Sequence, residues 1–192
     1  MEQQGSGHGN MDEMKYIHSM NWHEYFTCDA DAGILYFKER PREMFSTLRG
    51  WRVWNAQNAN RAVGSPNAAG YLMVRLNKKR LYVVHRIIWE MVNGPIPDGM
   101  EVDHENTAKS DNKISNLRLA THSQNGFNKR KPRTNTSGYK GVTFHRATRK
   151  WASQIVANGK RIHIGLHESK DEAYAAYKVA AKNIHGEFAR VA

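Results

Sequence analysis

The last third of the chain alternates apolar and polar residues in three short runs and then changes to a helical pattern. Such alternation is typical of half-buried strands, and the Asn158-Gly159 pair between the second and third runs is typical of a tight hairpin turn. A helix is expected after Ser169, because Ser169 and Glu172 have the spacing of a capping box. The pattern predicts a three-stranded antiparallel sheet packed on one helix. The expected strands cover residues 140–146, 150–157 and 160–166. The helix residues expected to be buried are Ala173, Tyr177, Ala180 and Ile184.

The upstream part of the chain predicts shorter elements of both kinds. A hairpin is expected around the turn-rich CDADAG at residues 28–33, and a second hairpin across residues 70–84. A short helix is expected over residues 85–93, because Ile88, Met91 and Val92 recur at helical spacing and Gly94-Pro95 supplies a stop. Between the first hairpin and the second, the Gly- and Asn-rich connection that runs through Asn67 predicts no regular structure.

Two short strands and a helix are expected between residues 100 and 130. MEVDH and LRLA predict the strands, a long polar loop separates them, and Thr121 is suited to cap the helix that follows. A basic segment with a proline then predicts a linker between two modules. The expected organisation is a disordered leader at residues 1–20, a domain at 21–131, the linker at 132–136 and a second domain at 137–192.

The positive charge of the chain is concentrated in one acid-free stretch. No Asp or Glu occurs between Asp111 and Glu168, and this stretch holds twelve of the 29 basic residues. The rest of the chain is nearly balanced, so the net charge of +11 lies in this stretch. It favours a nucleic acid as the partner over a membrane surface, because lipid binding would call for a basic amphipathic helix and this stretch alternates like strands.

Composition narrows the class of protein further. The 40% hydrophobic content supports a folded core. The single cysteine, Cys28, excludes an intramolecular disulfide framework and a cysteine-cluster zinc finger. No run approaches the ~20 apolar residues of a membrane span, and the first residues lack the features of a signal peptide. We therefore expect an intracellular, cytoplasmic protein with no membrane partner.

Four polar residues mark the ends of the elements expected at 100–130. Asp103 and His104 are adjacent at a strand end, Asn116 precedes the next strand, and Asn125 falls on the helix. A strand, strand, helix unit can bring all four together. The pattern and its spacing resemble the HNH endonucleases, the ββα-metal nucleases found in phage and intron homing enzymes. The resemblance extends over roughly residues 22–131.

This resemblance implies a metal-dependent endonuclease that hydrolyses phosphodiester bonds of double-stranded DNA, in the host cell of a phage or intron element. It makes His104 the general base that activates water and Asn116 the residue that orients His104. Asp103 and Asn125 become the metal ligands. Asn125 stands where many members have histidine, and two oxygen ligands favour Mg²⁺ or Mn²⁺ over Zn²⁺. His85 either contacts the scissile phosphate or has a structural role.

The downstream domain resembles the plant ethylene-response-factor (APETALA-type) DNA-binding domain. The matching segments are SGYKGVTFHRATRKWASQI and KRIHIGLHESKDEAYAAYKVAAKNIHG. The resemblance implies a sheet that lies in the DNA major groove, where arginine suits guanine edges and lysine suits phosphates. Trp151 either touches the sugar-phosphate backbone or packs between sheet and helix. With the basic stretch, the expected DNA-contacting residues are Arg118, Lys129, Arg130, Lys131, Arg133, Lys140, Arg146, Arg149, Lys150, Trp151, Gln154, Lys160 and Arg161.

Two other functions stay open on the sequence. A non-catalytic, sequence-specific DNA-binding regulator would keep the nuclease fold as a relic, but a relic has no physical reason to retain all four motif residues. An RNA-binding protein would show exposed stacking aromatics on its sheet, for which Trp151 is thin support. We favour an α+β nuclease that acts as a monomer, with a ββα-metal module followed by the sheet-and-helix domain.

Overall fold

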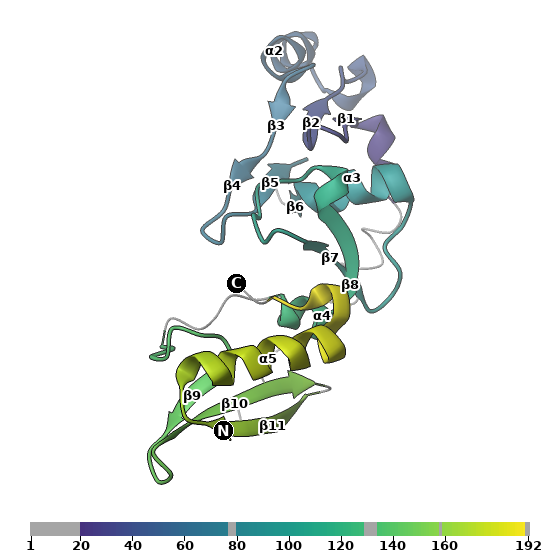
Figure 1. Cartoon of the computed structure of the whole chain (residues 1–192). Helices are drawn as coiled ribbons and strands as arrows, with labels where there is room; N and C mark the ends of the chain where they lie inside the picture. The colour runs from purple at the N-terminus through teal and green to yellow at the C-terminus, as the bar shows by residue number, and fades with distance from the viewer. Residues whose placement is uncertain (1–19, 77–79, 129–133, 158, 191–192) are drawn as a thin grey trace, which may run out of the picture. The chain divides into compact units, whose positions relative to one another are not determined.

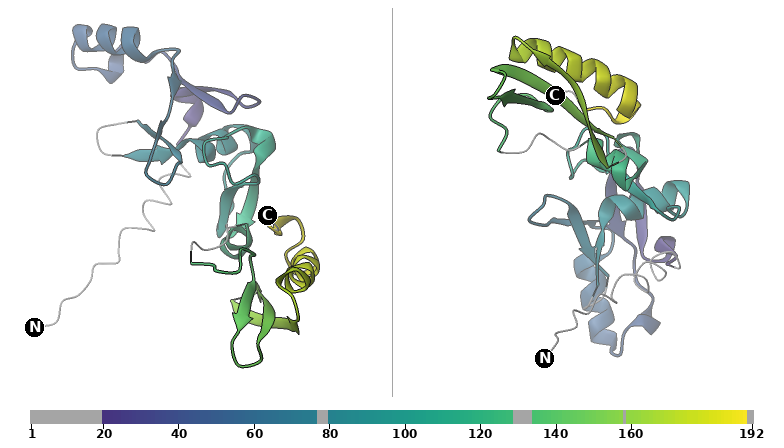
Figure 2. Two further views of the ribbon diagram at one scale, coloured as in Figure 1. Left: turned by 60° about the vertical axis from the view of Figure 1, so that its left-hand side comes forward. Right: turned by 90° about the horizontal axis from the view of Figure 1, so that it is seen from below.

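Antiparallel strands and helices occur together in both parts of the chain (Figures 1 and 2), which confirms the predicted α+β class. Contacts divide the chain into two compact units: unit 1 runs to Asp98 and includes Ala108–Arg118, and unit 2 comprises Gly99–Thr107 and the residues from Leu119 onward. The predicted domain boundaries stay a prediction. All but the last residue of the leader predicted at 1–20 lies outside the described residues, as do residues 129–133. The computed structural model describes residues 20–76, 80–128, 134–157 and 159–190.

Unit 1 contains two three-stranded antiparallel sheets, in the orders β1-β2-β3 and β4-β5-β6. The β1–β2 and β5–β6 hairpins form where the sequence predicted them, and Cys28 pairs with Leu35 in the first. The short strands β3 and β4 extend the sheets by pairing with β2 and β5. The strands are β1 (Phe26–Asp29), β2 (Ile34–Phe37), β3 (Ala62–Val63), β4 (Ser65–Pro66), β5 (Leu72–Arg75) and β6 (Leu81–Val83).

Helix α3 (Val84–Asn93) supplies much of the core of unit 1. Ile88 is fully buried together with its neighbour Ile87, whereas Val92, which shares the helical spacing of Ile88 in the sequence, is 48% exposed. Trp22 lies in the short 3-10 helix η1 (Trp22–Glu24), and its indole N–H donates to Glu90 on α3 at 2.5 Å. Within the described residues, no helix is long and apolar enough to cross a membrane.

Helix α2 (Leu48–Asn58) occupies a segment for which the sequence predicted no regular structure. The Thr47 hydroxyl caps its first turn. Trp54 packs edge-on against Phe37, with ring centroids 5.2 Å apart, and the Arg40 guanidinium lies 3.9 Å from the Trp54 ring centre. Because the helix depends on these tertiary contacts, local sequence patterns did not reveal it.

The turn of the β1–β2 hairpin supports the loop that carries Asn116. The Ile114 N–H donates to the Ala30 carbonyl at 2.9 Å. Gly33 has a φ of +71°, and a Cβ there would lie 2.4 Å from the Lys113 backbone nitrogen. Only glycine allows this approach, so the hairpin fixes the path of the loop.

The predicted strand, strand, helix order is present. Strands β7 (Met100–His104) and β8 (Leu117–Thr121) form a two-stranded sheet, and helix α4 (His122–Phe127) follows β8 directly. Thr121 and Gln124 form a capping box, in which each side chain accepts a hydrogen bond from the other residue's backbone N–H. The cap fixes the start of α4 at the end of β8, and α4 packs against β7.

The C-terminal part of unit 2 is an antiparallel sheet of order β11-β10-β9 with a helix along one face (Figure 2), as predicted. The Ser169 hydroxyl accepts from the Glu172 N–H at 3.2 Å at the predicted helix start. The elements are β9 (Val142–His145), β10 (Lys150–Ala157), β11 (Lys160–His167), α5 (Lys170–His185) and the 3-10 helix η4 (Gly186–Phe188).

The buried face of α5 differs from the prediction at its C-terminal end. Ala173 and Tyr177 are buried as expected, but Ile184 is 43% exposed. The buried row continues in steps of four to Ala181 and His185. His185 takes the inner position although it is polar, because its Nε2 lies 2.8 Å from the Val156 carbonyl and its ring stacks on a phenylalanine of α4.

Candidate active site

Strand β7 presents two carboxylates and a histidine. Glu101 and Asp103 are two residues apart, so they point to the same face of the strand, and His104 ends it. Asp103 is 7% exposed and His104 is 3% exposed, whereas Glu101 is only half-buried. A buried carboxylate requires hydrogen-bond donors, and the facing helix supplies one.

Asn128 is that donor. It caps the C-terminus of α4, and its Nδ2 lies 2.9 Å from Asp103 Oδ2 and 2.9 Å from the His104 carbonyl oxygen. Sequence reasoning did not single out Asn128. The available signal was its position three residues after Asn125, which places the two side chains on neighbouring turns of one helix face.

Asn125 contacts Glu101 rather than Asp103. Asn125 Nδ2 donates to Glu101 Oε2 at 2.5 Å, and Glu101 Oε1 lies 2.9 Å from Nδ1 of His122. The amide nitrogen of Asn125 is therefore directed to Glu101, and its oxygen, the atom that ligates cations, is directed away from it. Sequence reasoning also missed Glu101.

Asn116 belongs to unit 1. It ends the 3-10 helix η3 (Ile114–Asn116), is buried, and donates from Nδ2 to the Asp111 carbonyl at 2.7 Å. This bond holds the loop before β8 in a tight turn. Its role in orienting His104 stays a prediction.

The donor chemistry fits a small, hard cation. Asp103 and Asn125 offer a carboxylate and an amide oxygen, which suit Mg²⁺ or Mn²⁺. Among the described residues, no group of three or more His, Cys, Asp or Glu side chains is placed to hold a metal ion. A cation at this site would take its remaining ligands from water and a substrate phosphate, which is the usual manner of Mg²⁺.

Two of the predicted DNA-contacting residues share the open face of the C-terminal sheet. Gln154 pairs with His163 across the β10–β11 ladder, and Val156 pairs with Arg161. Paired residues lie on one face of an antiparallel sheet, and Ile155 between them packs in the core against α5. Gln154, Arg161 and His163 therefore face away from α5. His163 is a candidate that sequence reasoning did not include.

The remaining predicted DNA contacts on this domain have different surroundings. Arg146, Arg149 and Lys160 are exposed. Lys150 forms an ion pair with Glu168 at 2.6 Å. Trp151 packs edge-on against Phe144, its neighbour on β9, with ring centroids 5.2 Å apart, and its contact with DNA stays a prediction.

Lys140 has an internal partner. Its Nζ donates to the Phe127 carbonyl at the end of α4 at 2.6 Å, and burial lowers the pKa of Lys140 to about 8. Its proposed contact with DNA stays a prediction. Lys129, Arg130, Lys131 and Arg133 lie outside the described residues.

Two further predicted residues lie in unit 1. His85 is buried on α3, and its ring centroid lies 5.4 Å from that of Tyr71, which fits the structural alternative better than a phosphate contact. Arg118 is half-buried on β8.

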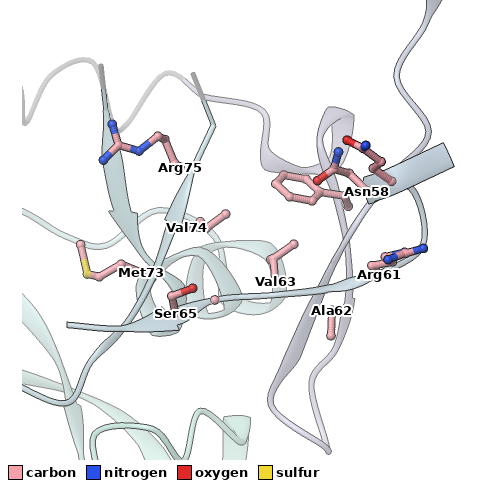
Figure 3. A pocket seen from close by; sticks show the side chains of 11 residues that line it. Asn58, Arg61, Ala62, Val63, Ser65, Met73, Val74 and Arg75 are labelled. Atoms are coloured by element: carbon pink, nitrogen blue, oxygen red, sulfur yellow. The ribbon is translucent and has the colours of Figure 1, made fainter. Parts of the chain in front are cut away.

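Unit 1 also contains a pocket of about 260 Å³. Figure 3 shows Arg61 and Arg75 at opposite sides of it, with Val63 and Val74 between them. No acidic side chain lines the pocket, and none of the sequence-predicted site residues belongs to it.

Comparison with known proteins identifies the class. A family model for HNH endonucleases matches residues 82–127. Protein 3.8 of Escherichia phage T7 is 33% identical over 106 residues, covering 55% of this chain and 87% of that protein. The uncharacterized HNH endonuclease L560 of Acanthamoeba polyphaga mimivirus is 36% identical over 107 residues, covering 55% of this chain and 54% of that protein. The chain belongs to the HNH endonuclease family and is a nuclease.

Two further similarities are partial. The AP2-like ethylene-responsive transcription factor TOE2 of Arabidopsis thaliana is 40% identical over 58 residues, covering 30% of this chain and 12% of that protein. A solved structure of the HNH homing endonuclease I-HmuI, which concerns DNA binding and cleavage by that enzyme, matches this chain with a TM-score of 0.37 at 19% identity. It covers 53% of this chain and 49% of that one.

Proposed function

We propose that the chain is a metal-dependent, site-preferring endonuclease of double-stranded DNA, in which His104 activates water and Asp103 and Asn125 hold Mg²⁺ or Mn²⁺. The observation that carries the proposal is the packing of α4 against the end of β7, where Asp103, His104 and Asn125 occur on adjoining elements of one unit. Incubation of the full chain with supercoiled plasmid, with and without Mg²⁺, tests it by resolving nicked from linear product. Nicking or cleavage should require the cation.

These residue types match the needs of phosphodiester hydrolysis. The anionic phosphate repels hydroxide and the alkoxide is a poor leaving group, so a cation at the site supplies charge neutralisation. A histidine, whose ordinary pKa is near 6.5, can accept the proton of the attacking water at neutral pH. The burial of Asp103 lowers the effective dielectric around its carboxylate, which strengthens the attraction of that carboxylate for a bound cation.

The C-terminal sheet is the proposed DNA-holding surface. Arg161 and Gln154 lie on its open face, and Arg146, Arg149 and Lys160 are exposed on the same domain. The partial similarity to an AP2-like transcription factor supports this assignment. The domain would hold the substrate while the β7–α4 site cuts it.

The metal ligands should respond to removal through the Mg²⁺ requirement. Asp103→Ala and Asn125→Ala are each expected to raise the Mg²⁺ concentration for half-maximal nicking, because each removes one oxygen donor from a cation with few protein ligands. Asp98→Ala and Asn93→Ala change the same residue types at exposed positions of unit 1 and serve as controls. Unchanged Mg²⁺ titrations for both site variants would remove these residues from the metal shell.

DNA affinity should fall steeply with salt. Each phosphate neutralised contributes ~0.9 to the slope of log affinity against log salt, so several contacts by exposed arginines should give a slope of several units. Arg161→Gln is expected to lower that slope by about one unit if it contacts a phosphate. Fluorescence anisotropy with a labelled duplex at increasing NaCl measures both quantities. A slope near zero for the wild-type chain would contradict the DNA role.

A further inference from the structure

We propose that Glu101 and Asn128 are positioning residues. Each of them orients a proposed metal ligand that lies on the other of the two elements, β7 or the α4 end. Asn128 on the helix side holds Asp103 on β7, and Glu101 on β7 holds Asn125 on α4. The proposal rests on the proposed function, because it takes Asp103 and Asn125 as the ligands. It assigns roles to two residues that the nuclease motif in the sequence did not include.

The crossed arrangement follows from two periodicities. Glu101 and Asp103 are two residues apart on a strand and share a face. Asn125 and Asn128 are three residues apart at the end of a helix and also share a face. When α4 packs against β7, the four residues form two hydrogen-bonded pairs, Glu101 with Asn125 and Asp103 with Asn128, each of which is called a rung below. Each rung contains one predicted ligand and one partner.

In the Asn128 rung, the positioning residue is buried and has three hydrogen-bond acceptors within reach. Asn128 is 6% exposed, and its amide nitrogen lies 2.9 Å from Asp103 Oδ2, 2.9 Å from the His104 carbonyl and 3.4 Å from the Glu105 carbonyl. One side chain thus fixes the Asp103 carboxylate and the backbone that follows the general base, at the His104 and Glu105 carbonyls.

The residue before Asn128 is held by the C-terminal domain. The Phe127 carbonyl accepts from Lys140 Nζ at 2.6 Å, and the Phe127 ring stacks on His185 with centroids 3.7 Å apart. The Arg190 guanidinium also donates to the Thr107 hydroxyl, in the loop after β7, at 2.5 Å. These contacts hold the end of α4 in place, so the amide of Asn128 is pre-organised toward Asp103.

The Glu101 rung sets the orientation of an amide. The Glu101 carboxylate accepts from Asn125 at 2.5 Å, and its other oxygen lies 2.9 Å from His122 Nδ1. Glu101 can only accept hydrogen bonds when ionised, so it selects the nitrogen end of Asn125. The oxygen end is then presented for the cation. Partners that orient metal ligands in this way typically contribute 10- to 100-fold to metal affinity.

The test measures Mn²⁺ binding to the full chain in the absence of DNA. The electron paramagnetic resonance signal of free Mn²⁺ reports how much of the ion remains unbound. Asn128→Ala is expected to raise the Mn²⁺ dissociation constant by ~10- to 100-fold, and Glu101→Ala by a similar factor. Glu101→Gln keeps an acceptor oxygen for Asn125 and should recover part of the loss. Asn93→Ala, at an exposed position, should bind as the wild type does.

The Asp103→Ala variant separates the two levels of the proposal. If it binds Mn²⁺ as tightly as the wild type, the proposed function is wrong about the ligand. If it loses binding while Asn128→Ala does not, the positioning role of Asn128 is overturned and the metal site stands. Glu101→Gln as weak as Glu101→Ala would mean that charge, not orientation, explains the Glu101 effect.

A folding control accompanies each variant. Thermal unfolding by circular dichroism should show that Asn128→Ala is folded at the assay temperature. If it is not, Asn128→Ser, which retains a shorter hydroxyl donor, replaces it. Asn128→Ser with wild-type Mn²⁺ affinity would then overturn the assignment, because a hydroxyl on the shorter serine side chain cannot reach all three acceptors.

Discussion

Replacing His104 by alanine is expected to slow DNA cleavage by ~10²- to 10⁴-fold while leaving DNA affinity nearly unchanged. The rate falls because the variant has no general base for the attacking water. Affinity persists because it derives mainly from phosphate contacts by basic side chains on other elements. Single-turnover nicking of supercoiled plasmid measures the rate, and fluorescence anisotropy with a labelled duplex measures affinity.

His23→Ala is the matched control for this prediction. His23 is exposed and lies in unit 1, so its removal should alter neither quantity. Cleavage by His104→Ala at the wild-type rate would refute the assignment of the general base. A loss of affinity equal to the loss of rate would instead indicate that His104 holds the substrate or the local fold.

Replacing Gly141 by alanine is expected to lower the free energy of unfolding by roughly 2–5 kcal/mol. Gly141 has a φ of +74°, a conformation that costs an L-residue about 1–2 kcal/mol. Its Cβ would also lie 2.2 Å from the ring of Tyr177, a residue of α5 that is 2% exposed and packs against Ile155 of β10. Overpacking of this kind costs about 1–3 kcal/mol, because the ring has no space into which to move.

Gly159→Ala separates the two causes. Gly159 has a φ of +72° and no atom within 4 Å of its Cβ position, so alanine there should cost only the backbone term. Urea unfolding of the full chain, followed by circular dichroism, compares the two variants. Equal losses would show that the contact with Tyr177 contributes nothing.

Elements with local boundary signals were predictable from the sequence. The caps at Thr121 and Ser169 marked the starts of α4 and α5, and the CDADAG turn marked the first hairpin. Each of these signals depends on residues that lie within a few positions of one another, so the local sequence is enough to place the helix start or the turn. Helix α2 was missed because its tryptophans pack against distant residues.

The site was predictable only in part, because some of its contacts form only in the tertiary structure. The spacing of Asp103, His104 and Asn125 is visible along the chain, and the structure places all three on β7 and α4. Glu101 and Asn128 acquire their partners only when the helix packs on the strand. Similarly, Lys140 looks like the other cations in sequence, but a backbone carbonyl of α4 binds it.

The close approach of Gly33 to the loop before β8 means that the nuclease motif is not structurally self-contained. That loop carries Asn116, and it rests on a hairpin that lies far upstream in the sequence. If only the strands, loop and helix of the motif were grafted onto another scaffold, the loop would lose its contacts with the β1–β2 hairpin. A transplant that preserves the geometry of Asn116 would have to include the upstream hairpin with glycine at its turn.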